Sequence, residues 1–65
     1  MDEYRVLEHL VKEIAKLRHE KSEFIADGKA QDHAEYRHTC GVIRGLSLAE
    51  QMCKDLVQRL ERNNE

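Results

Sequence analysis

Residues 26–32 read Ala-Asp-Gly-Lys-Ala-Gln-Asp and separate two long amphipathic segments, so this short stretch decides the fold. Gly28 is suited to the left-handed backbone conformation that ends a helix, because glycine has no Cβ to clash there. Asp32, with Glu35 three positions later, has the pattern of a side-chain cap at the start of a helix. A connection of about four or five residues between two helices predicts that they lie antiparallel.

The segment before this turn carries apolar residues at helical spacing. A line with alternating steps of three and four is formed by Leu7, Leu10, Ile14, Leu17, Lys21 and Phe24. A flanking line at steps of seven is formed by Tyr4, Val11, Arg18 and Ile25. This periodicity predicts an amphipathic helix of coiled-coil character, whose first line packs against the second helix.

The segment after the turn repeats the pattern. Its main line is formed by Val42, Leu46, Ala49, Cys53, Leu56 and Leu60, flanked by Tyr36, Ile43 and Val57. Glu50 with Lys54, and Asp55 with Arg59, are spaced as ion pairs one turn apart. We place both pairs on the outside of the helix.

These patterns predict one all-α domain over residues 1–65, an antiparallel two-helix hairpin with coiled-coil character. We expect a helix at about 2–26, a turn at about 27–31 and a helix at about 32–62. Two helices leave one face open, and chains below about 70–80 residues rarely build a sufficient core alone. We therefore expect the hairpin to complete a bundle with other copies or with a larger partner.

The composition excludes several classes of protein. Hydrophobic residues make up 40% of the chain and charged residues 37%, with no proline or tryptophan, which argues against β-sandwiches and barrels. No apolar run exceeds three residues, so we expect no transmembrane segment and no signal peptide. Cys40 and Cys53 share one helix too far apart to bridge, which favours free thiols in a reducing compartment over an intermolecular disulfide or a metal site.

One stretch of the second helix is unusual and suggests a contact surface. From Tyr36 to Ala49 the chain carries no acid, and two glycines lie one turn apart within this stretch. Glycine in a helix interior costs about 1 kcal/mol relative to alanine, so their presence suggests close approach by another surface. The alternative is that they accommodate Tyr36 and Phe24 inside the hairpin. The predicted partner interface comprises Tyr36, Gly41, Arg44, Gly45, Leu48 and Met52.

Residues suited to catalysis or metal binding form no convincing constellation. Glu35 and His38 have the Glu-x-x-His spacing of di-iron helical bundles, but such a site needs further inward carboxylates. His9 and Glu13 lie one turn apart on a charged face. We expect no catalytic residue, no metal, no cofactor and no small-molecule substrate, so the protein is not predicted to be an enzyme.

Nucleic-acid binding is also not expected. The formal net charge is −2, and Arg37, Arg44, Arg59 and Arg62 form at most an interrupted basic edge. No aromatic side chain lies between these arginines to stack on bases.

Two resemblances bear on the protein's class. The chain resembles the Rop family in its length, its turn at 27–32 and its heptads. Rop proteins are homodimers of helical hairpins that bind RNA loops. No Rop functional residue matches a position in this chain. In residues 26–36, 40–46 and 55–61 it resembles small uncharacterised proteins of tailed bacteriophages of aquatic bacteria. The second resemblance implies a phage origin and no established activity.

Together these observations predict a non-enzymatic structural or accessory protein of a tailed-phage virion. Its hairpins would pack against copies of themselves or against a larger phage structural protein. The alternative is a homodimeric, phage-encoded regulator that binds a host protein or, like Rop, an RNA. The expected location is the virion or the host cytoplasm, without membrane association.

Overall fold

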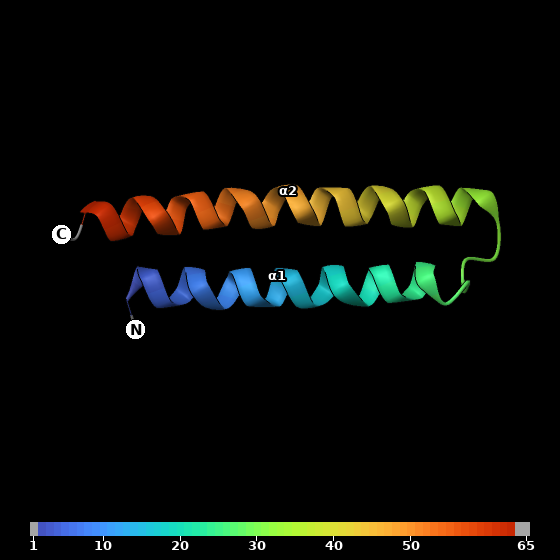
Figure 1. Cartoon of the computed structure of the whole chain (residues 1–65), viewed down its shortest axis with the longest axis horizontal. Helices are drawn as coiled ribbons and strands as arrows, with labels where there is room; N and C mark the ends of the chain where they lie inside the picture. Colours follow the sequence, from blue (N-terminus) through green and yellow to red (C-terminus); the bar gives the residue numbers. More distant parts are fainter. Residues whose placement is uncertain (1, 64–65) are drawn as a thin grey trace.

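The structure, a computed structural model, describes residues 2–63 and shows two antiparallel helices joined by a short turn (Figure 1). Helix α1 runs over Glu3–Ala26 and helix α2 over His33–Asn63. The longer α2 extends beyond the start of α1 at the end where the chain termini lie (Figure 1). The predicted all-α hairpin is thereby confirmed. Met1, Asn64 and Glu65, which the predicted domain also covers, lie outside the described residues.

The helix ends follow the local chemistry of the turn. The Asp2 carboxylate caps α1 by accepting a hydrogen bond from the backbone N–H of Arg5 at 2.9 Å. Gly28 has a φ of 69°, the left-handed conformation predicted for it. The Asp32 carboxylate accepts from the N–H of Glu35 at 2.8 Å, which confirms the predicted cap of α2. Both caps satisfy backbone donors that a helix start leaves without partners.

The face that α1 turns towards α2 differs from the predicted one. The partly buried residues of α1 are Tyr4, Leu7, Val11, Ile14, Ala15, Arg18, Ser22, Phe24 and Ile25. Leu10 and Leu17, predicted at the centre of the contact, are 44% and 42% exposed, so that prediction was wrong. One partner helix covers only a narrow strip of a helix surface, and this strip is centred on the line of Val11 and Arg18.

The contact face of α2 agrees with the predicted main line at Val42, Leu46, Ala49, Cys53 and Leu60, which are half-buried, and extends onto the flanking line. Its buried residues are Thr39 and Glu50, 7% and 8% exposed, whereas Leu56 of the predicted main line is 41% exposed. Glu50 was predicted on the outside, and this was wrong because Arg18 of α1 lies opposite it. The predicted pair of Asp55 with Arg59 is not among the ion pairs of residues 2–63; Asp55 accepts a hydrogen bond from the Gln51 amide at 3.0 Å.

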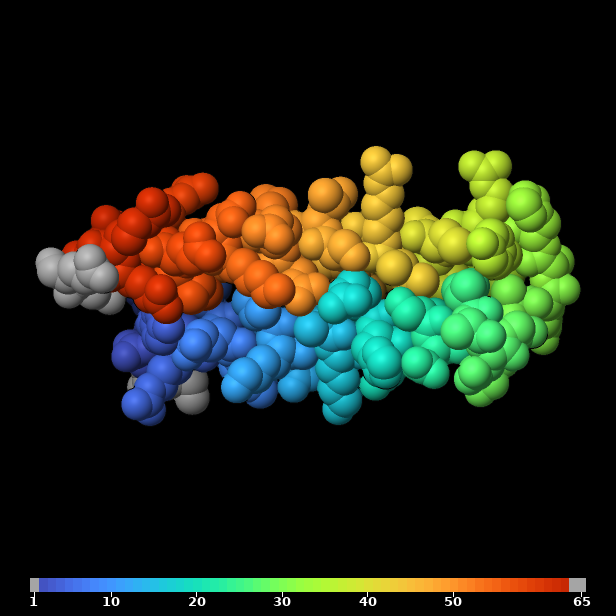
Figure 2. All heavy atoms as spheres, viewed as in Figure 1, coloured from blue at the N-terminus to red at the C-terminus, as the bar shows by residue number. Residues whose placement is uncertain are grey.

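The hairpin encloses no apolar core. No hydrophobic residue among those described is fully buried. The molecule is a rod of 50 × 17 × 14 Å (Figure 2). Its radius of gyration is 14.9 Å, against about 11 Å for a compact domain of this length. The two helices thus form a single layer with both broad sides open.

Candidate interaction surface

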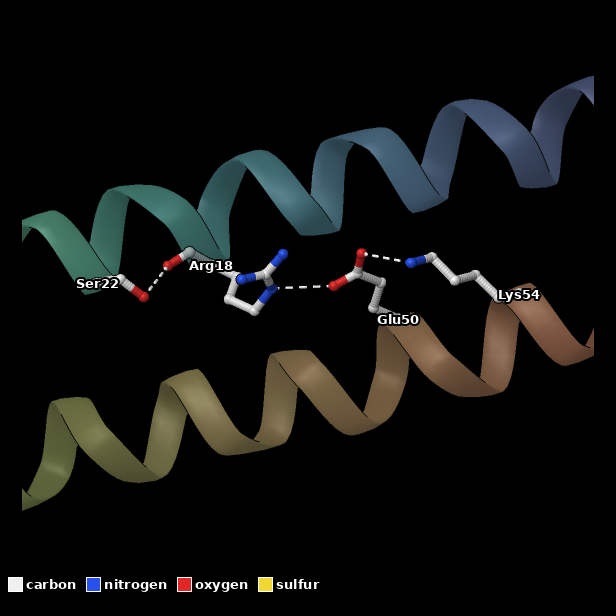
Figure 3. Close-up of polar contacts among 4 residues, drawn as sticks. All are labelled: Arg18, Ser22, Glu50 and Lys54. Atoms are coloured by element: carbon white, nitrogen blue, oxygen red, sulfur yellow. Dashed lines mark hydrogen bonds and ion pairs between the residues drawn. The ribbon is translucent and has the colours of Figure 1, made fainter.

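A charged contact joins the two helices near the middle of the hairpin. The Arg18 Nε donates to Glu50 Oε1 at 2.9 Å, and the Lys54 ammonium lies 3.2 Å from Glu50 Oε2 (Figure 3). The Ser22 hydroxyl donates to the Arg18 carbonyl at 3.0 Å. Only 11% of the Glu50 side chain is exposed. Hydrogen bonds from Lys54 and then Arg18 lower the pKa of Glu50 below its usual value of 4.5.

The predicted ion pair of Glu50 with Lys54 is confirmed, whereas the contact of Arg18 with Glu50 was missed although a signal for it is present. Arg18 lies in the flanking line of the first helix, and Glu50 lies seven residues from both Ile43 and Val57 of the flanking line in the second. Complementary charges in two flanking lines indicate that those lines face each other. The Arg18–Glu50 pair lies within the strip where the two flanking lines face each other.

A second polar contact closes the open end of the hairpin. The Tyr4 hydroxyl donates to the Glu61 carboxylate. This hydrogen bond raises the pKa of Tyr4 to about 12, because ionising the phenol would remove the donated proton beside a carboxylate. The groove between these two contacts is lined by Glu8, Val11, Lys12, Lys54, Val57, Gln58 and Glu61. This side of the hairpin, the polar face, is therefore mostly charged.

The opposite side of the hairpin, called the open face, is apolar along most of its length and carries charged residues at its two ends. Its α1 residues are Glu3, Val6, Leu10, Leu17, Lys21 and Phe24, and its α2 residues are Val42, Gly45, Ala49, Met52 and Leu56. At the open end one groove is lined by Glu3, Val6, Leu7, Leu56 and Leu60. At the turn end another is lined by Glu20, Lys21, Phe24, Glu35, His38 and Thr39.

These two grooves show that the apolar lines of both helices share one side. Glu3 and Phe24 are the ends of a line with steps of seven residues along α1, which stays on one side of a helix. Both ends of this line share a groove with α2. Leu10 and Leu17 lie between them, so they belong to the same side. Val6, at 50% exposure, is the most exposed large apolar residue of α1.

Five of the six residues of the predicted interface lie on one side of α2, and Tyr36 lies apart from them. Tyr36 stacks on His33 with ring centroids 6.3 Å apart and lies about 160° around α2 from Met52. Gly45 and Met52 belong to the open face, and Met52 is 73% exposed. Gly41, Arg44 and Leu48 are also exposed, and together with Gly45 and Met52 they lie within an arc of about 100° around α2. Their role in a partner interface stays a prediction.

The two helical glycines do not make room for aromatic rings. A Cβ added to Gly41 or Gly45 would meet no atom within 4 Å. The alternative that they accommodate Tyr36 and Phe24 inside the hairpin is therefore wrong. Neither glycine is required by contacts within this chain.

The groups considered for metal binding are dispersed. Glu35 and His38 line the turn-end groove with Glu20, but residues 2–63 hold no cluster of three side chains arranged for a metal. His9 lies 3.7 Å from Glu13, with both side chains largely exposed. The half-buried cysteines are free thiols.

Comparison of the chain with protein-family models, curated proteins and solved structures gave no match. The resemblances to tailed-phage proteins and to the Rop family therefore stay predictions. Neither described helix has an apolar stretch long enough to cross a membrane.

Proposed function

We propose that this protein is a non-enzymatic structural subunit whose hairpin packs, through its open face, against copies of itself or a larger protein. The observation that carries the proposal is a layer of two helices without a single buried hydrophobic residue in the described part of the chain. Most of the stability of helices in proteins comes from burying an amphipathic face. A hairpin that leaves this face in water gains that stability when a partner covers it.

The assembly to which we assign the subunit is the particle of a tailed bacteriophage. This assignment is supported by the sequence resemblance in residues 26–36, 40–46 and 55–61. A rod of two helices, 50 Å long, suits repeated side-by-side packing.

Mass spectrometry of purified particles and of infected-cell lysate tests this proposal. We expect the chain in the particles in many copies. A matched pair of variants then tests the surface: Leu17→Asp places a charge on the open face, and Lys16→Asp places the same side chain on the outside of α1. Leu17→Asp should prevent incorporation, and Lys16→Asp should not. Equal incorporation of both variants would contradict the role of the open face.

The same experiment distinguishes a structural subunit from the alternative, a phage-encoded regulator. A regulator that binds a host protein or RNA is expected in the lysate and absent from particles. RNA binding would further show a steep salt dependence that decreases when Arg37 and Arg44 are replaced, because each phosphate contact releases counterions.

A further inference from the structure

The side of α2 that points away from α1 carries a line of exposed residues with two positive charges. This line, called the outer strip, consists of Arg37, Gly41, Arg44 and Leu48. Gly41 lies half a turn around α2 from the buried Glu50, which contacts α1. Residues 36–49 include no acid. The nearest acids along α2, Glu35 and Glu50, lie on sides of the helix that face α1. No carboxylate of α2 therefore offsets the charge of the outer strip.

Contacts within the chain do not use the outer strip. Arg37 and Arg44 take part in none of the ion pairs or side-chain hydrogen bonds of residues 2–63. Figure 2 shows long side chains standing out from this part of α2, which is coloured yellow. Leu48 is 60% exposed. A Cβ added to Gly41 meets nothing within 4 Å, although glycine inside a helix is less favourable than alanine.

The exposed side of α1 carries the complementary charges at the same spacing. Glu13, Leu17 and Glu20 are exposed and follow one another at steps of four and three residues, as do the first three residues of the outer strip. Within α1 and α2, Glu13 and Glu20 are the one pair of acids seven residues apart. We propose that α1 of a second copy packs along the outer strip, with Leu17 against Gly41 and each acid beside an arginine.

The lysines next to this line of α1 determine the direction in which the second copy lies. Lys16 and Lys21 flank the line on its two sides. When α1 runs parallel to α2 of the other copy, these lysines lie level with Cys40 and Gly45, which carry no charge. In the antiparallel direction Lys21 lies level with Arg37, and like charges repel. The parallel direction therefore keeps both lysines away from the arginines.

The apolar residues that continue the two lines also match in the parallel direction. Leu10 lies level with Ala34, and Phe24 lies level with Leu48. Leu10 and Leu17 are 44% and 42% exposed in the single chain. Apolar layers then alternate with layers of opposite charge along the contact, in steps of three and four residues as in a parallel coiled coil.

The contact joins different surfaces of the two copies, so it repeats from copy to copy. Because the outer strip lies opposite the α1 contact, each hairpin binds one neighbour through α1 and another through α2. Such an arrangement generates rings or filaments rather than closed dimers. One helix strip is smaller than a standard interface, and we expect a dissociation constant on the order of 0.1 mM for each contact. Unfolding experiments at micromolar concentration therefore report on the single chain.

Charge reversal in the full chain tests the inference, which rests on the proposed self-packing. Sedimentation equilibrium is measured from about 10 µM to about 1 mM. We expect the average mass of the wild type to exceed two chains at the highest concentration. Glu13→Lys, Arg37→Glu and Arg44→Glu each place like charges in every contact, and each should weaken association by about tenfold. Circular dichroism of each sample confirms that helicity is retained.

Two mixtures carry equal changes of charge and differ only in register. When Glu13→Lys is mixed with Arg37→Glu, the reversed charges meet each other, so assembly should continue past two chains as in the wild type. When Glu13→Lys is mixed with Arg44→Glu, only the unchanged surfaces pair opposite charges. This second mixture should stop at two chains.

Gly41→Leu tests the close approach of Leu17. A leucine has room at this position within one chain and favours the helix over glycine, so the fold is retained while the space for Leu17 is filled. We expect association to weaken by about tenfold. Ser47→Leu is the matched control, because Ser47 is exposed about a third of a turn around α2 from Gly41. It should leave association unchanged.

Three results would overturn the inference: a wild type that stays monomeric or stops at two chains, two mixtures that behave alike, or an equal loss in Ser47→Leu. None of these excludes the proposed structural role. A chain that is found in particles but does not associate with itself would bind a larger protein there.

Discussion

Replacing Gly41 by alanine should stabilise the protein, although Gly41 was predicted to be needed for close contact. Gly41 lies inside α2, and a Cβ built there meets nothing within 4 Å. Alanine limits the conformations of the unfolded chain and favours the helix without a clash to offset the gain. The position is exposed, and no atom of this chain lies near the added methyl group.

The expected gain is about 1 kcal/mol, the helix-propensity difference between glycine and alanine. In a domain of this size, 1 kcal/mol corresponds to roughly 4–8 °C in melting temperature. The assay is urea unfolding followed by circular dichroism, together with thermal melts. All variants are compared at one protein concentration, because association makes the midpoint concentration-dependent.

Gly28→Ala is the matched control, because the same substitution there should have the opposite effect. The φ of 69° at Gly28 is strained for any residue with a Cβ, at a cost of roughly 1–2 kcal/mol. If Gly41→Ala lowers stability, the space around Gly41 is occupied in solution, and the conclusion that this part of α2 is open is refuted.

The remaining predictions concern the polar contacts. In a Tyr36→Phe background, absorbance at alkaline pH should show Tyr4 ionising with a pKa of about 12. Adding Glu61→Gln should lower this pKa, because the hydrogen bond is lost. A pKa near 10 in both proteins would contradict the hydrogen bond. Because the pKa of Glu50 is lowered in the folded state, its contribution to stability is present above pH 4.5 and lost as the pH falls through the folded pKa. Melting temperatures from pH 6 to 3 should therefore fall less steeply for Glu50→Gln than for the wild type, and parallel curves would rule this out. Asp32→Ala removes the cap of α2 and should lower the free energy of unfolding by about 1 kcal/mol. Urea unfolding measures this loss. Asp32→Asn is the control, because it retains a side-chain acceptor.

The turn and the helix ends could be predicted from sequence because they depend on neighbouring residues. Gly28 adopts the left-handed conformation and Asp32 caps the helix through contacts within three positions along the chain. The predicted helices, about 2–26 and 32–62, compare with observed helices at Glu3–Ala26 and His33–Asn63. The presence of apolar residues at helical spacing was likewise enough to indicate a hairpin with an unpartnered side.

The rotation of each helix could not be predicted in the same way, because two adjacent lines on each helix are apolar. Hydrophobic periodicity shows which half of a helix avoids water, but it does not choose between neighbouring lines within that half. Leu10 and Leu17 were assigned to the hairpin contact for this reason, and both are more than 40% exposed.

The sequence by itself therefore determined the two helices, their turn and their antiparallel direction, since these depend on local capping and periodicity. Only the tertiary structure decided which strip of each helix is buried. The buried strip includes contacts between residues far apart in the chain, such as Arg18 and Glu50, 32 positions apart, which local sequence patterns do not show. With the flanking lines in contact, Leu10 and Leu17 of α1 and Leu56 of α2 stay more than 40% exposed and belong to the open face, since one partner helix cannot cover both adjacent apolar lines.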